Sequence, residues 1–167
     1  APSTLVEASQ LLVDGQRLLQ ESHASEAEPL LLRALVFYEQ RDDFPSECIH
    51  VFGDLASIAT ARGDLSGAES LLQRGLALAN ARFGSDHPDL ATMLGGLARL
   101  YLRRSDYTKA EPVLQRLLEI RRARGEEHPE VATVLASLAT ARSAMGAHES
   151  AERLLRRVLA IREKTLA

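Results

Sequence analysis

The chain has 167 residues, a formal net charge of −3, and a composition that is 46% hydrophobic but only 4% aromatic. Leu, Ala, Arg and Glu are good helix formers and no stretch alternates β-branched and aromatic residues, so the composition favours an all-α fold. The acidic balance argues against nucleic acid as a partner, the single cysteine excludes an internal disulfide, and no apolar run is long enough for membrane insertion.

An Ala-Glu pair recurs through the chain at a nearly constant spacing. Self-similarity at a fixed period is the signature of a repeat architecture. The alanines are Ala27, Ala68, Ala110 and Ala151, separated by 41, 42 and 41 residues, and each follows a small residue by twelve positions: Gly15, Ala56, Ala98 and Ala139. The sequence therefore predicts a single domain over residues 1–167 that contains four helix pairs, at about 4–41, 45–82, 87–123 and 128–166.

The periodicity of apolar residues places two helices in each pair. In the third pair Leu94, Leu97 and Tyr101 recur at i, i+3 and i+7, on one face of a helix. The sequences DHPD (86–89) and EHPE (127–130) put proline at the first helical position and an acid in the first turn, both favourable at a helix start. In chain order the predicted helices are 4–20, 25–40, 46–61, 65–81, 88–103, 107–122, 129–144 and 148–165.

This arrangement of small residues resembles the tetratricopeptide repeat. The third marker, seven positions after each repeated alanine, is Ala34 or Gly75 in the first two copies and departs to Leu117 and Val158 in the others. The long step, close to 42 residues, together with "DHPD", "AEP" and "AIREK", is similar to the kinesin light chain type of repeat. The resemblance implies a right-handed α-solenoid of four antiparallel helix pairs, with a concave groove that binds a peptide or a helix of a partner protein.

The resemblance also implies which residues form that groove, because the family's ligands contact the first helix of each pair. The candidates are Leu12, Gln16, His50, Gly53, Asp54, Ser57, Thr92, Gly95, Gly96, Arg99, Arg103, Thr133, Ala136 and Thr140. Most are small, which leaves room for a bulky or helical ligand. The segments GGLA (95–98) and ASLA (136–139) stand where kinesin light chain repeats carry asparagines, and this argues against an extended cargo peptide.

Two arginines, Arg99 and Arg103, stand one helical turn apart in the predicted groove. Arginine forms charge-assisted, often bidentate pairs with carboxylates, so the two could anchor an acidic partner. The alternative is a solvated face, or pairing with acids of the second repeat such as Asp54.

No pattern of catalytic residues is present in the sequence. Cys48 and His50 are close, but the cysteine is better placed in a helix interior, and His87 and His128 belong to helix starts. We therefore predict no enzyme activity, no metal and no cofactor, and instead a scaffold, adaptor or regulatory module that binds a protein or peptide. With no signal segment visible, the default location is cytoplasmic, and the chain is expected to be a fragment of a longer protein.

Two alternatives to a binding module remain open at this stage. One is weak self-association, in which the acidic first half of the chain meets the basic third repeat, whose residues 84–125 carry five acids and eight bases. The other is packing against an adjoining kinase, NTPase or other effector domain.

Overall fold

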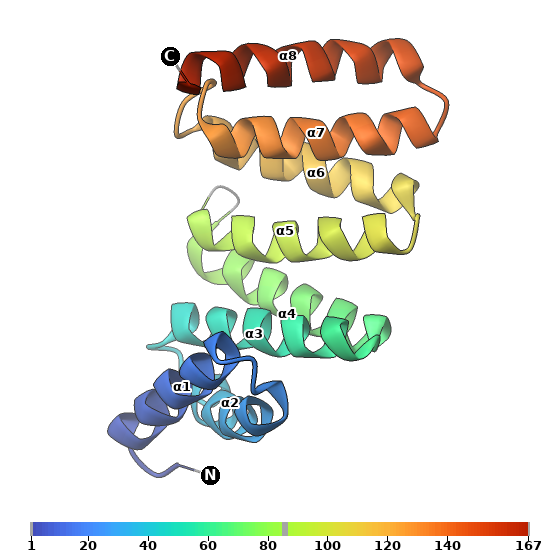
Figure 1. Ribbon diagram of the computed structural model, residues 1–167. Coiled ribbons are helices and arrows are strands. Elements are labelled where there is room, and N and C mark those ends of the chain that lie inside the picture. Colours follow the sequence, from blue (N-terminus) through green and yellow to red (C-terminus); the bar gives the residue numbers. More distant parts are fainter. Residues whose placement is uncertain (1, 85–86, 167) are drawn as a thin grey trace. The chain divides into compact units, whose positions relative to one another are not determined.

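The computed structural model describes residues 2–84 and 87–166, and every regular element within them is an α-helix (Figure 1). The helices are α1 (Leu5–Gln20), α2 (Ala24–Glu39), α3 (Pro45–Arg62), α4 (Leu65–Phe83), α5 (Pro88–Arg103), α6 (Tyr107–Arg122), α7 (Pro129–Ala144) and α8 (His148–Leu166). All eight predicted helices are present, and each boundary lies within two residues of its predicted position. The all-α prediction is confirmed. Asp86, the first residue of the predicted DHPD start, lies outside the described residues.

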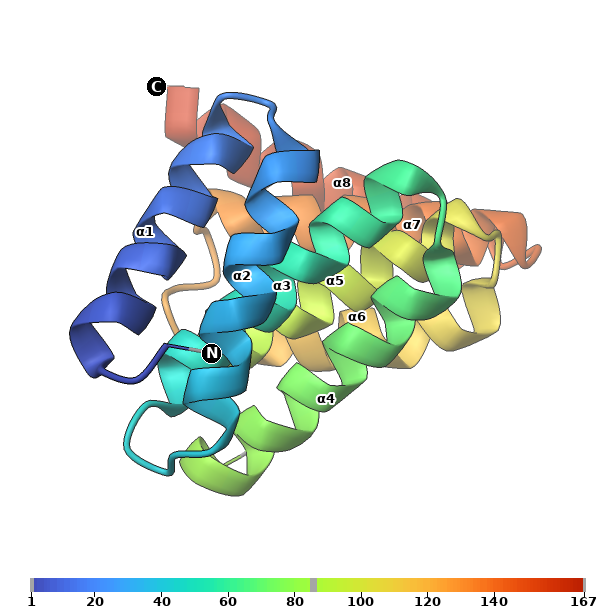
Figure 2. The ribbon, with the colours of Figure 1, turned by 90° about the horizontal axis from the view of Figure 1, so that it is seen from below.

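The chain forms two compact units, Ala1–Ser85 (unit 1) and Asp86–Ala167 (unit 2). In unit 1, α1 packs on α2, α2 on α3, and α3 on α4; in unit 2 the same order of contacts links α5, α6, α7 and α8. Consecutive helices within a unit run antiparallel, as α1 and α2 show in both ribbon views (Figures 1 and 2). Each unit thus contains two helix pairs.

The small residues that mark the repeats lie in the core of each helix pair. Ala56, Ala98 and Ala139 on the first helices are at most 3% exposed, and the alanines that follow them on the second helices are at most 4% exposed. In the first pair the contact is tighter still, because a Cβ on Gly15 would lie 2.8 Å from Cδ2 of Leu31. Close packing of this kind tolerates little added volume.

The starts of four helices are held by capping side chains. Asp64 and Asp106 cap α4 and α6 by accepting hydrogen bonds from the backbone N–H groups of Gly67 and Lys109. His87 and His128 cap α5 and α7, where Nδ1 accepts a backbone N–H at 3.2 and 3.3 Å, respectively. The prediction that these two histidines serve helix starts is confirmed.

Adding one methyl group should have opposite effects at Gly15 and Gly95, both of which lie inside helices. Gly15→Ala should lower the free energy of unfolding by roughly 1 kcal/mol, because the overpacking against Leu31 outweighs the gain in helix propensity. Gly95→Ala is the matched control: its Cβ meets only Leu117 Cδ2, at 4.0 Å, so the propensity gain should raise stability by about 0.5–1 kcal/mol. Urea unfolding measures both, and a stabilising Gly15→Ala would contradict the close approach of α1 and α2.

Candidate partner-binding site

A hollow of about 630 Å³ lies in unit 2 among α5, α6 and α7. It is lined by Gly95, Ala98, Arg99, Leu102 and Arg103 of α5, by Leu114, Leu117 and Arg121 of α6, and by Glu130, Thr133, Val134 and Ser137 of α7. A volume of this size falls within the range of natural ligand sites. It is large enough to admit a bulky side chain of a partner.

The floor of the hollow is apolar. Leu114, Leu117 and Val134 are 2%, 6% and 5% exposed, so they belong to the core and present only their outer atoms to the hollow. The wall formed by α5 stays open because Gly95 has no side chain, and the nearest neighbour that a Cβ would meet is 4.0 Å away. An apolar side chain of a partner that enters the hollow would leave water and contact a hydrocarbon surface, which is favourable.

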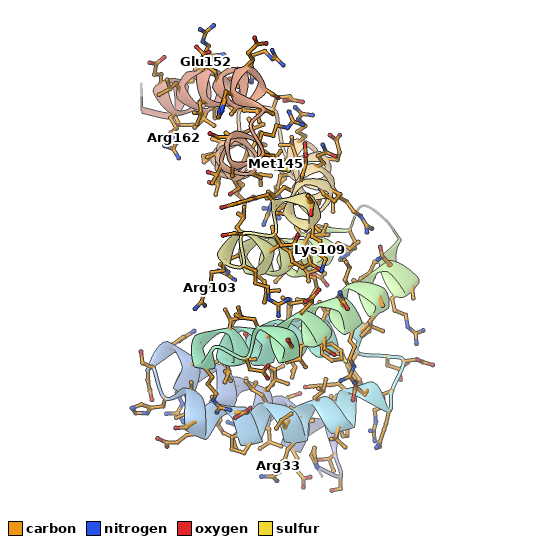
Figure 3. The ribbon with its side chains drawn as sticks, turned by 90° about the vertical axis from the view of Figure 1, so that its right-hand side faces the viewer. Arg33, Arg103, Lys109, Met145, Glu152 and Arg162 are labelled. Atoms are coloured by element: carbon orange, nitrogen blue, oxygen red, sulfur yellow. The ribbon has the colours of Figure 1, made fainter. Side chains whose placement is uncertain are left out.

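The rim of the hollow is polar and carries several arginines. Glu130 is bound by two cations, with its Oε2 atom 2.9 Å from Arg121 Nη1 and 3.0 Å from Arg124 Nη1. Its charge is therefore neutralised within unit 2. Arg99 and Arg103 line the α5 side and are both exposed, and Arg103 projects outward from the helix (Figure 3). The residues that line the hollow include three arginines and one glutamate.

The predicted groove residues of unit 2 divide into two groups. Gly95, Arg99, Arg103 and Thr133 line the hollow. The remaining four lie outside it: Thr92 and Thr140 are exposed, and Gly96 and Ala136 are partly exposed.

Several hydroxyl groups on α7 are used within the helix itself. Thr133 Oγ1 donates to the carbonyl of Pro129 at 3.2 Å, Ser137 Oγ to that of Thr133 at 3.2 Å, and Thr140 Oγ1 to that of Ala136 at 3.1 Å. Their protons are therefore committed, and this wall offers small side chains but few hydrogen-bond donors to a ligand.

In unit 1 the structure brings two of the predicted residues together across different helices. Gln16 Nε2 on α1 donates to Asp54 Oδ2 on α3 at 3.0 Å. Burial raises the pKa of Asp54 above its ordinary value, against the opposing effects of the Gln16 hydrogen bond and of nearby His50. Asp54 is thus a half-buried acceptor that already has a donor.

The other predicted residues of unit 1 have different surroundings. His50 and Ser57 are exposed, and Ser57 Oγ donates to the carbonyl of the partly exposed Gly53 at 3.0 Å. Leu12 is only 9% exposed and contributes to the core. The other five predicted residues of unit 1 are thus at least partly exposed, and Leu12 is the exception.

The α6 floor of the hollow, and Val134 and Glu130 on α7, are not among the residues that the sequence predicts for the groove. The glycine at position 95 was the available signal, since a missing side chain above a leucine-rich neighbouring helix leaves a void. Val13 on α1 is also absent from the predicted groove, although it stands 41 residues before Asp54 and so at the same position of the repeat. It is 57% exposed.

Unit 1 has a second, smaller hollow of about 330 Å³ that includes Cys48. Two of its three arginines are paired with acids of the same rim, Arg74 with Glu39 and Arg82 with Asp42, and Arg41 donates to the carbonyl of Phe37. Burial, assisted by the charge of Glu39, raises the pKa of the Cys48 thiol to about 11. The thiol is therefore protonated at neutral pH and is a poor nucleophile.

The described residues show neither a metal site nor a membrane span. Within residues 2–84 and 87–166, no three His, Cys, Asp or Glu side chains are grouped so that they could hold a metal ion. No helix over the same residues combines the length and the apolar character that crossing a bilayer requires.

These antiparallel helix pairs, with small residues at their contacts, define an all-α helical repeat solenoid. A family model described as tetratricopeptide repeat matches residues 47–123 and 101–164. The chain belongs to the tetratricopeptide repeat family, and its repeats are of the kinesin light chain-like type. Repeats of this family generally mediate protein–protein interaction, and the fold is typically a non-enzymatic scaffold.

Solved structures of other proteins share this fold. BtubC (BKLC) from P. vanneervenii superimposes with a TM-score of 0.86 at 18% identity, covering 96% of this chain and 65% of BtubC. A candidate kinesin light chain from Podosopora anserina with nearly identical repeats gives 0.78 at 26% identity, covering 95% and 76%. MamA gives 0.74 at 18% identity, covering 95% and 80%. Among curated proteins, no sequence matches.

Asp54→Asn should stabilise the chain more at pH 7 than at pH 3. Because the pKa of Asp54 is raised in the folded state, that state binds the proton more tightly, and stability falls as pH rises through the interval between the unfolded and folded pKa values. Asparagine keeps an oxygen that accepts from Gln16 and carries no charge. Thermal unfolding followed by circular dichroism across this pH range measures the effect, and a gain that does not change with pH would contradict it.

Cys48 should react with iodoacetamide at pH 8 at least 100-fold more slowly in the folded chain than in urea. The side chain is 2% exposed, and with a pKa of about 11 only roughly one thiol in a thousand is ionised at that pH. Mass spectrometry of timed reactions gives both rates. Equal rates would show that the thiol is accessible and activated.

Proposed function

We propose that the chain is a protein-interaction module whose unit 2 binds an acidic helix of a partner protein. A bulky apolar side chain of the partner occupies the hollow among α5, α6 and α7, and a neighbouring carboxylate pairs with Arg99 and Arg103. The observation that carries this proposal is the combination of an apolar floor beneath Gly95 with exposed arginines on the adjoining rim. In this role the chain is a scaffold, adaptor or regulatory domain.

The two parts of the hollow contribute differently to binding. Burial of one leucine or phenylalanine side chain is worth about 1.5–3 kcal/mol. An ion pair at an exposed rim is worth roughly 0.2–1 kcal/mol and is weakened by salt. The apolar anchor thus supplies most of the affinity, whereas Arg99 and Arg103 select acidic over basic partners and speed association.

The α7 wall favours a helical ligand over an extended one. An extended peptide has unpaired backbone groups and needs donors and acceptors along its path, but the hydroxyl protons of Thr133 and Ser137 are used within α7. A helix satisfies its own backbone. The small side chains of Gly95, Thr133 and Ser137 let its axis come close.

Panning of a displayed peptide library against the chain tests the proposal. The probes are helix-forming peptides of about 20 residues, a length at which an isolated helix becomes stable enough to select, randomised on one face. Selection on the 167-residue chain should enrich Leu, Phe or Met with Asp or Glu one turn away. Enrichment of basic peptides, or no enrichment, would contradict the proposal.

Variants of the chain then locate the site on the selected peptides. Arg99→Glu with Arg103→Glu should weaken binding about 10-fold or more, since each reversal replaces an attraction by a repulsion. Gly95→Leu should abolish it by filling the hollow. Arg33→Glu, at an exposed position of α2 (Figure 3), is the control: it changes the charge by as much as either single reversal and should leave affinity unchanged. Titration calorimetry measures the affinities, and circular dichroism verifies folding.

Charge-driven head-to-tail self-association, the alternative that the sequence suggests, stays a prediction. Light scattering over a concentration and salt series tests it, and a monomer that is insensitive to salt would rule it out.

A further inference from the structure

The surface of α8 carries two exposed leucines at positions that are buried elsewhere in the array. Leu155 and Leu159 are 48% and 59% exposed. One repeat earlier, at the same positions relative to the Ala-Glu pair, Leu114 and Leu118 of α6 are 2% and 6% exposed. The next helix, α7, packs on α6. Leu155 and Leu159 therefore form an apolar stripe on α8, a helix-docking face that no described helix of unit 2 covers.

The contact between α6 and α7 shows how such a face holds a helix. Glu111 Oε1 lies 2.9 Å from Arg142 Nε near one end of the contact, and Arg121 Nη1 lies 2.9 Å from Glu130 Oε2 near the other. An acid, two leucines and an arginine thus follow one another along α6, and the charged residues at both ends pair with residues of the helix that covers them.

The same four residue types recur on α8 at the same spacing. Glu152, Leu155, Leu159 and Arg162 stand 41 residues after Glu111, Leu114, Leu118 and Arg121. Glu152 and Arg162 are both exposed on α8 (Figure 3). Glu152 also accepts from Arg156 at 2.6 Å, as Glu111 accepts from Gln115 at 3.3 Å, so an intrahelical bond of this kind is compatible with docking.

The order of these residues makes the stripe complementary to itself. The intervals between them are three, four and three residues, symmetric about Arg157. When two copies of α8 lie antiparallel about that point, Glu152 of one faces Arg162 of the other at both ends, and Leu155 faces Leu159 in between. We propose that two copies of this chain pair in this way through α8.

A second copy docked by its α1 fits less well. With Gly15 aligned to Ala139, the α1 residues that correspond to Val131, Val134 and Leu138 are Glu7, Gln10 and Asp14. All three α7 residues are buried, at 5% exposure or less, whereas their α1 counterparts are polar and Gln10 donates to Asp14 at 3.1 Å. An apolar stripe gains little from such a face, and the charges of Glu7 and Asp14 would lose water there.

The pairing should be weak and reversible. A single contact between two helices is smaller than the roughly 1,200–2,000 Å² of a standard stable interface. We expect a monomer–dimer equilibrium in the micromolar to millimolar range. Sedimentation velocity of the 167-residue chain from about 10 μM to 1 mM measures this equilibrium. A chain that stays strictly monomeric at 1 mM overturns the proposal, even if a helix of another protein covers this face.

Charge exchange tests the geometry. Glu152→Arg or Arg162→Glu alone places like charges opposite each other at both ends and should weaken dimerisation at least 10-fold. The double exchange restores opposite charges at both ends and should restore most of the affinity. Leu155→Ser with Leu159→Ser should abolish pairing. Failure of the double exchange to rescue, with both single variants impaired, would overturn the antiparallel register.

Arg153→Glu provides the matched control, because Arg153 is exposed on α8 but points away from the stripe by the helical period. It should leave the dimerisation constant unchanged, and a loss as large as that of Arg162→Glu, which changes the charge equally, would show a general charge effect instead. All substituted side chains, including those of the two leucines, are exposed, so each variant should keep the fold.

Discussion

The distance between the two helices of each pair is the constraint on which the rest of this structure depends. Gly15, Ala56, Ala98 and Ala139 are small because a neighbouring helix passes directly over them, and a Cβ on Gly15 would already overlap Leu31. Close pairs leave their remaining apolar side chains on one side, where the next pair must cover them. Packing within a pair therefore determines where pairs stack, and with it which positions stay open for partners.

Most of the fold could be predicted from the sequence because these constraints are local. Proline at the first helical position, the histidine and aspartate caps, and the twelve-residue step between small residues each depend on a few neighbouring residues, and they recur along the chain. The candidate site was only partly predictable. Arg99 and Thr133 follow from the helical register, but the floor formed by Leu114 and Leu117 exists because three helices meet around a missing side chain. A void arises from the packing of several helices, so no single residue in the sequence marks its position.

Equivalent residues of the repeat differ in role because their neighbours differ. Leu114 and Leu155 occupy the same position in successive pairs. Leu114 is core because α7 packs on α6, whereas Leu155 is on the surface because no described helix of unit 2 covers it. Glycines inside the first helices differ in the same way. Gly15 is crowded by Leu31, whereas Gly95, inside the equivalent helix of another repeat, opens onto a hollow. The repeat pattern therefore predicts where a residue lies on its helix, but whether that residue is buried or exposed depends on the neighbouring helices.

Unit 2 uses one kind of chemistry for its internal contact and for both of its proposed surfaces. Where α7 docks on α6, leucines provide the burial, and Glu111 and Arg121 fix the register by pairing with residues of opposite charge. The hollow offers an apolar floor beside Arg99 and Arg103, and α8 offers two leucines between Glu152 and Arg162. Apolar contact is not directional, so the arginines and acids decide which helix binds and in which orientation. A partner helix with the same order of charges as α7 can therefore bind through the same kind of contact by which α7 packs on α6.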